Sequence, residues 1–195
     1  MKVQYNDPLT GSAPNYQRVA ALPSRRGLVL PAGSVARIPI DVRRPDAHTI
    51  IAALQLVVDQ WGRDPRVRQA TTRLLTSRVN NDRGNIDVVF RWVVNHMTYL
   101  ADPDGGELVQ TPIILLDQVT RKGRAYGDCD DHVVLLGAML VSIGVPARVV
   151  GVKLGASPIF NHVVVEVPSN GGWRVLDPCA KQTAAPNYRE RLVVG

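Results

Sequence analysis

Residues 126–132, with the sequence Tyr-Gly-Asp-Cys-Asp-Asp-His, and the apolar run Val133 to Ile143 behind them decide the fold. Asp128 is a residue type that caps helix N-termini, and the apolar run predicts a buried helix that ends at Gly144. Cys129 therefore falls in the first turn, where unpaired N–H groups and the helix dipole favour a thiolate and can hold an oxyanion beside the sulfur. The position suits a nucleophile, although most free cysteines are buried structural residues.

Two later segments supply a base and a carboxylate. Phe160 to Val167 and Gly172 to Asp177 each have the pattern of a strand, and the Gly-rich turn between them predicts an antiparallel hairpin. In such a hairpin the start of the first strand lies beside the end of the second, so His162 and Asp177 meet at one edge. Cysteine, histidine and aspartate in this arrangement are what thiol acyl transfer requires.

The motifs follow one another along the chain. They are Trp92 to Tyr99, Tyr-Gly-x-Cys ending at Cys129, Gly-Val-Pro-Ala-Arg at residues 144–148, Asn161-His162, and Trp-x-x-x-Asp-Pro at residues 173–178. Together, from about Ile86 to Asp177, they resemble the transglutaminase-like superfamily of cysteine proteases and acyltransferases, and its short prokaryotic and viral members more than the large calcium-dependent enzymes.

The resemblance implies a role for each matched residue. Cys129 becomes the nucleophile, His162 the general base and acid, and Asp177 the carboxylate that orients the histidine. The oxyanion is expected to bind the backbone N–H of Cys129 and an upstream side chain, for which Tyr99 and Tyr126 both stay open. No metal or cofactor is implied, and the expected substrate is a peptide or protein.

The acidic residues at the start of the predicted helix allow other interpretations of this segment. The carboxylates of Asp128, Asp130 and Asp131 oppose thiolate formation at Cys129. His132 could act as its base or join the three carboxylates in a metal site, but side chains lean toward the helix N-terminus and place His132 poorly for reaching across the sulfur. Cys179 is expected to be a small buried residue, and both cysteines to be free thiols in a reducing compartment.

The fold class expected is α+β, and the resemblance implies a papain/transglutaminase-like core. Periodicity predicts helices over residues 46–61, 65–79, 86–97 and 113–119, a turn over residues 80–85, and strands at residues 147–154, 160–167 and 172–177, with a weaker one at residues 191–194. The helix that starts at Cys129 should pack across this small antiparallel sheet.

The acidic loop 102–107 lacks the ladder of carboxylates that a calcium loop needs.

Residues 1–45 differ in composition from the domain expected over residues 46–195. The net charge is +6 over 195 residues, and seven basic against two acidic residues place +5 of it on this Pro- and Gly-rich arm. Short pieces such as Gly27 to Leu30 and Val35 to Ile40 could add as edge strands. Contact with the arm's own domain or with neighbouring subunits is expected; nucleic-acid binding is not, because no aromatic residues are interleaved with the arginines.

Two functions are compatible with these features. The first is a thiol hydrolase or acyltransferase that acts on peptide or amide bonds. The second is a structural or assembly protein of a tailed-phage virion that keeps the fold and uses residues 1–45 to contact its neighbours. The first residues lack the apolar core of a signal peptide and no apolar run is long enough to span a membrane, so synthesis in the cytoplasm is expected, with incorporation into a virion under the second function.

Overall fold

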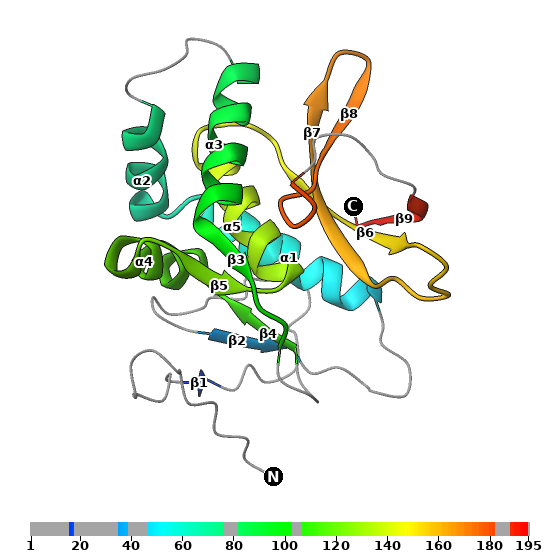
Figure 1. Cartoon of the computed structure of the whole chain (residues 1–195). Coiled ribbons are helices and arrows are strands. Elements are labelled where there is room, and N and C mark those ends of the chain that lie inside the picture. The colour runs from blue at the N-terminus through cyan, green and yellow to red at the C-terminus, as the bar shows by residue number, and fades with distance from the viewer. Residues whose placement is uncertain are drawn as a thin grey trace.

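The computed structural model describes residues 47–75, 82–102, 107–181 and 188–194, with two short strand segments at residues 16–17 and 35–38. Its helices are α1 (Ala47–Trp61), α2 (Pro65–Leu75), α3 (Asp82–His96), α4 (Pro112–Lys122) and α5 (Cys129–Ser142). Its strands are β1 (Tyr16–Gln17), β2 (Val35–Ile38), β3 (Met97–Tyr99), β4 (Glu107–Gln110), β5 (Ala125–Gly127), β6 (Arg148–Leu154), β7 (His162–Ser169), β8 (Gly172–Leu176) and β9 (Tyr188–Val193). Figure 1 shows their arrangement, with α5 at the centre.

Beyond its first turn, helix α5 is apolar on all sides, and helices with this character are buried. It contacts each of the other four described helices and strand β7, and nearly every one of its residues is buried. Gly137 lets α1 approach closely, because a Cβ at this position would lie 2.9 Å from Val58 Cγ2. The helix that begins at Cys129 is therefore held from several directions, and so is its first turn.

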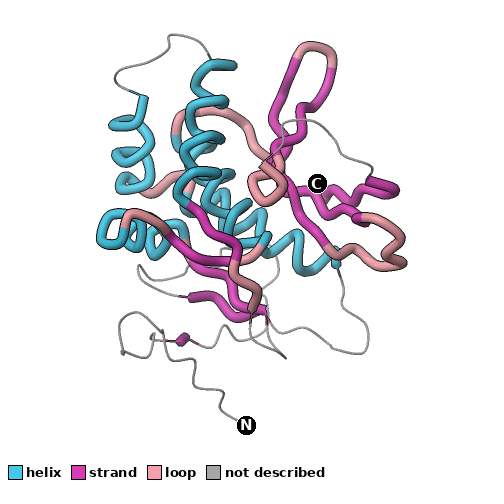
Figure 2. Tube along the Cα trace, viewed as in Figure 1, coloured by secondary structure: helices cyan, strands magenta, loops and turns pink. Residues whose placement is uncertain are grey.

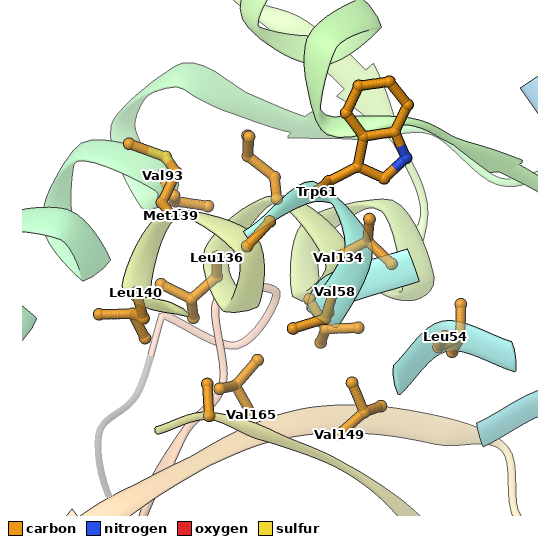
Figure 3. Packing of buried hydrophobic residues seen from close by; sticks show 14 of the residues in the cluster. Leu54, Val58, Trp61, Val93, Val134, Leu136, Met139, Leu140, Val149 and Val165 are labelled. Carbon is orange, nitrogen blue, oxygen red and sulfur yellow. The ribbon is translucent and has the colours of Figure 1, made fainter. Parts of the chain in front are cut away.

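Strands β6 to β9 form an antiparallel sheet in the order β8-β7-β6-β9, and α5 packs on one face of it. Figure 2 shows the helices on one side of this sheet. Leu136 and Leu140 of α5 lie above Val149 and Val165 of the sheet in one continuous core (Figure 3). The α+β fold expected from the sequence is confirmed.

The predicted hairpin is confirmed by the pairing of β7 with β8, in which Val165 lies opposite Leu176. The weak strand prediction near the C-terminus is confirmed as well, and β9 is longer than expected. The turn predicted over residues 80–85 is wrong from Asp82 onward, because α3 begins there. An acidic residue type followed by polar ones suits a first helical turn with its free N–H groups, so these residues resemble a turn in sequence.

Two small sheets lie beside the helices. Strands β3 and β5 run parallel, with Tyr99 opposite Gly127, so both strands end next to the start of α5. In the other small sheet β2 pairs with β1 on one side and with β4 on the other, so the strand expected in this segment is present over Val35–Ile38, but the edge position expected for it is wrong because β2 is the central strand. The remainder of the arm, including residues 27–30, and the acidic loop at residues 103–106 lie outside the described residues. The assembly role of the arm stays a prediction.

Candidate active site

Cys129 is the first residue of α5 and follows a tightly packed turn. Asp128 is the N-cap, with extended backbone at φ −92° and ψ −156°, and its side chain accepts a hydrogen bond from the Asp130 N–H. Gly127 is packed so closely that an added Cβ would collide with the side chain of Asp131. Glycine is therefore required immediately before the cap, which explains the Gly-Asp-Cys sequence in physical terms.

The side chains of Gln110 and Gln118 form a hydrogen-bond network that stabilises this turn. Gln110 donates to Asp131 through its backbone N–H at 2.6 Å and through Nε2 at 2.8 Å. Gln110 Nε2 also donates to the Tyr126 carbonyl at 2.8 Å, and Gln110 Oε1 accepts from Gln118 Nε2 at 2.7 Å. Gln118 Oε1 in turn accepts from the Tyr126 N–H. The network joins β4, α4, β5 and α5, and sequence analysis missed both glutamines because no local pattern marks them.

His162 and Asp177 meet as the hairpin predicted. His162 Nε2 lies 2.9 Å from Asp177 Oδ2, and both side chains are almost fully buried. Asp177 Oδ1 accepts from the N–H groups of Cys179 and Ala180, at 3.0 and 2.9 Å. The hydroxyl of Tyr188, on β9, donates to Oδ2 at 2.8 Å.

These contacts keep the Asp177 carboxyl ionised. Burial acts to raise its pKa, but the hydrogen bond from His162, followed by those from the Ala180 N–H and Tyr188, holds the pKa below its ordinary value of 3.8. A negative charge on Asp177 favours donation by Nε2 of His162. The imidazole then carries its proton on Nε2, and Nδ1 has the lone pair.

The sulfur of Cys129 lies beside the start of β7, where it accepts a hydrogen bond from the backbone N–H of Val163, the residue that follows His162. Burial, followed by the charges of Asp128 and Asp130, raises the pKa of Cys129 well above 9.0, and the hydrogen bond from Val163 only partly offsets this. The resting group is the neutral thiol. Burial and acidic neighbours outweigh the helix dipole that would favour a thiolate.

Tyr99, one of the two tyrosines considered for the oxyanion, has its hydroxyl within electrostatic reach of Cys129. Partial burial raises the pKa of Tyr99, and the charges of Cys129 and Asp128 raise it further. Tyr99 ends β3 beside Gly127, and 59% of its surface is exposed. Tyr126 is fixed through its backbone by Gln110 and Gln118.

His132 is turned back toward the start of its own helix. Its Nδ1 lies 2.6 Å from the Asp128 carbonyl, and burial lowers its pKa. The carboxylates of Asp128, Asp130 and Asp131 gather within 4.8 Å of one another. Asp128 caps the helix and Asp131 binds Gln110, so these two have structural roles in the turn.

A family model for the transglutaminase-like superfamily matches residues 69–178, more than half of the chain. The chain belongs to this superfamily. The superfamily match includes α5 and the hairpin with Cys129, His162 and Asp177, and it ends before β9. No curated protein is similar enough to the chain to count as a match.

Solved structures with a similar arrangement include a candidate protease of Parabacteroides distasonis, at 17% identity over 63% of this chain and 26% of that one, with a TM-score of 0.46. A candidate cysteine protease of Cytophaga hutchinsonii is 20% identical over 72% of this chain and 45% of that one, with a TM-score of 0.47. The periplasmic domain of TgpA from Pseudomonas aeruginosa is 21% identical over 60% of this chain and 44% of that one, with a TM-score of 0.43. This superfamily member thus spans less than half the length of each of these chains.

Among the helices in the described residues, none has the length and apolar character needed to cross a membrane.

Proposed function

We propose that the protein is a thiol-dependent hydrolase or acyltransferase acting on peptide or amide bonds, with Cys129 as nucleophile, His162 as general base and acid, and Asp177 as the orienting carboxylate. The observation that carries this proposal is the His162–Asp177 hydrogen bond, formed one residue away from the N–H that binds the Cys129 sulfur. Membership of the superfamily supports the same roles.

The chemistry begins from a neutral thiol. Nδ1 of His162 takes the thiol proton as the sulfur attacks the carbonyl carbon, so a preformed thiolate is not required. The resulting oxyanion is held by the backbone N–H of Cys129 and by the hydroxyl of Tyr99. Asp177 stabilises the imidazolium that forms.

The tetrahedral intermediate then collapses with cleavage of the C–N bond. His162 returns its proton to the leaving amine, which departs and leaves a thioester on Cys129. In hydrolysis, His162 deprotonates a water molecule that attacks the thioester, and the acid product and free thiol are released. In acyl transfer, an amine takes the place of the water.

The two thiols in the chain allow an internally controlled test. Burial and neighbouring carboxylates raise the pKa of both thiols, and in the proposed mechanism only Cys129 has a base, His162, so we expect iodoacetamide at neutral pH to alkylate Cys129 faster than Cys179. His162→Ala should slow alkylation of Cys129 at least about tenfold and leave Cys179 within about twofold. Equal, slow alkylation of both thiols in the wild type would refute the proposal.

Acylation provides a second measurement. p-Nitrophenyl acetate should give a burst of nitrophenolate and an acetyl group on Cys129 that mass spectrometry locates. Cys129→Ala should abolish the burst, and His162→Ala should reduce its rate by about 10²-fold or more. Acetylation distributed over lysines, with no burst, would contradict nucleophilic catalysis at Cys129.

A further inference from the structure

Asp177 receives a hydrogen bond from the opposite edge of the sheet. It follows β8, at one edge, while Tyr188 begins β9, at the other edge, with β7 and β6 between them. Tyr188 packs against a small apolar cluster on the face of the sheet opposite α5, and its hydroxyl reaches Asp177 Oδ2. The contact therefore joins the two edges of the sheet across this face.

An irregularity in the sheet directs Tyr188 toward this face. Val152 on β6 pairs with Arg191 on β9, and an unbroken register would then place residue 189 opposite Leu154. The register shifts between Val152 and Leu154, so that Tyr188 lies opposite Leu154 instead. Because side chains alternate between the two faces of a strand, a shift of one residue moves Tyr188 to the face that carries His162.

We propose that Tyr188 is a positioning residue of the active site, whose hydroxyl fixes Asp177 Oδ2 in the orientation that binds His162. This inference rests on the proposed function of the His162–Asp177 pair. It assigns β9 a role in positioning the active site. This strand lies beyond the residues matched by the family model.

Four donors converge on one carboxylate. The N–H groups of Cys179 and Ala180 bind Oδ1, and His162 and Tyr188 share Oδ2. An ionised carboxylate has about four acceptor positions, so the set is complete, and a protonated carboxyl group could not accept all of these bonds. Burial and the bond to Asp177 raise the pKa of Tyr188, so its hydroxyl keeps its proton at neutral pH and stays a donor.

The two donors on Oδ2 compete for the same negative charge. Removal of the Tyr188 hydroxyl leaves more of that charge to His162, so the imidazolium becomes more stable. Tyr188→Phe keeps the ring on the apolar cluster and removes only the donor. Glu190→Gln is the matched control on β9, because Glu190 pairs with Lys153 at an exposed position.

The test is an NMR titration of His162 in the full chain, made in a Cys129→Ala background so that the thiol does not titrate with it. The other titratable groups around the pair are His132 on α5, Cys179 after β8 and Tyr188 itself. We expect Tyr188→Phe to raise the pKa of His162 by about half a pH unit, and Glu190→Gln to leave it unchanged. With Cys129 restored, Tyr188→Phe should slow acylation by p-nitrophenyl acetate about tenfold, because Asp177 is no longer held in place and the loss of positioning outweighs the gain in basicity of His162.

A fluorinated tyrosine incorporated at position 188 should shift the pKa of His162 in the direction opposite to Tyr188→Phe. Its more acidic hydroxyl donates more strongly to Oδ2, so the pKa of His162 should fall while the packing is kept. A lower melting temperature in Tyr188→Phe with an unchanged His162 titration would reduce Tyr188 to a structural role and overturn the inference. Because the titration needs no turnover, absence of acylation in the wild type would count against the proposed function alone.

Discussion

The two faces of the β6–β9 sheet bury their side chains in different ways. The face against α5 is apolar and belongs to the main core, with Val149, Val163, Val165, Val167 and Leu176. The opposite face has a smaller apolar cluster around Val164, and it also carries His162 and Glu166. Alternate residues of β7 point to the two opposite faces of the sheet. A strand that looks mostly apolar in sequence therefore contributes both to the packing face and to the face that carries His162.

Glu166 shows how the second face accommodates charge. Its side chain is 1% exposed and is bound by Arg148 at 2.8 and 2.9 Å and by Arg191. The Arg148 guanidinium also lies 3.6 Å from the centre of the Trp173 ring. The buried carboxylate thus has a cation on either side of it, and the strand that positions His162 is anchored by ion pairs as well as by apolar packing.

The largest expected effect comes from Asp177→Asn on the functional face. Oδ1 accepts from two backbone N–H groups, so the oxygen of an asparagine amide would take that position and turn its NH₂ toward His162. Nε2 of His162 would then have to accept, which moves the ring proton to Nδ1 and blocks it as the base for Cys129. We expect the acylation rate to fall about 10²- to 10⁴-fold in a variant that still folds. A variant with at least half of the wild-type rate would show that the tautomer is set by another group.

Next in size is Glu166→Ala on the same face. This variant leaves two arginines without their carboxylate, and because both are partly exposed we expect a loss of about 3 kcal/mol in the free energy of unfolding. Urea denaturation measures it. Glu190→Ala, which removes an exposed ion pair with Lys153, is the control and should cost less than about 1 kcal/mol. Equal costs for the two variants would mean that burial of Glu166 contributes nothing beyond a surface pair.

A pair of alanine variants compares the faces directly. Val165→Ala removes two methyl groups beneath α5, where the core is rigid, and should cost about 2 kcal/mol in the free energy of unfolding. Val164→Ala lies on the other face, where the buried cluster is small and the partly buried Tyr188 can move into the space, and should cost about half as much. The reverse order in urea denaturation would contradict this difference in rigidity.

The smallest effect concerns acid stability. Since the pKa of Asp177 is lower in the folded protein, its contribution to stability is fully present above the pKa of the unfolded chain, about 3.9, and is lost as the pH falls through the lower folded value. The difference in unfolding free energy between wild type and Asp177→Asn should therefore shrink below about pH 4. A difference that stays constant down to pH 3 would mean that Asp177 gains nothing from ionisation in the folded state.

Local pattern was sufficient for much of this molecule. Asp128 with the apolar run behind it predicted where α5 begins, and the spacing of two strands around a Gly-rich turn predicted that His162 and Asp177 meet. Both depend on residues close together in the chain, where helix capping and hairpin pairing follow from short-range geometry. The roles of Cys129, His162 and Asp177 in catalysis remain predictions that the experiments above address.

Other features depend on residues that are distant in the chain. The amide network from Gln110 and Gln118 forms only when β4 and α4 are folded against α5, and no spacing in the sequence indicates it. The raised pKa of Cys129 comes first from burial, which only packing against distant segments decides, while the opposing charges of Asp128 and Asp130 were expected from the sequence.

By itself, the sequence determined most of the helices, the strands of the main sheet, the helix that carries the thiol, and the pairing that joins imidazole to carboxylate, because each follows from periodicity and turn chemistry over short stretches. Only the tertiary structure decided which face of the sheet each β7 residue occupies, and it alone turned Tyr188 toward Asp177 from the far edge. The physical reason is that a shift of one residue in strand register reverses the direction of a side chain, and that shift depends on contacts between strands and not on the composition of either one.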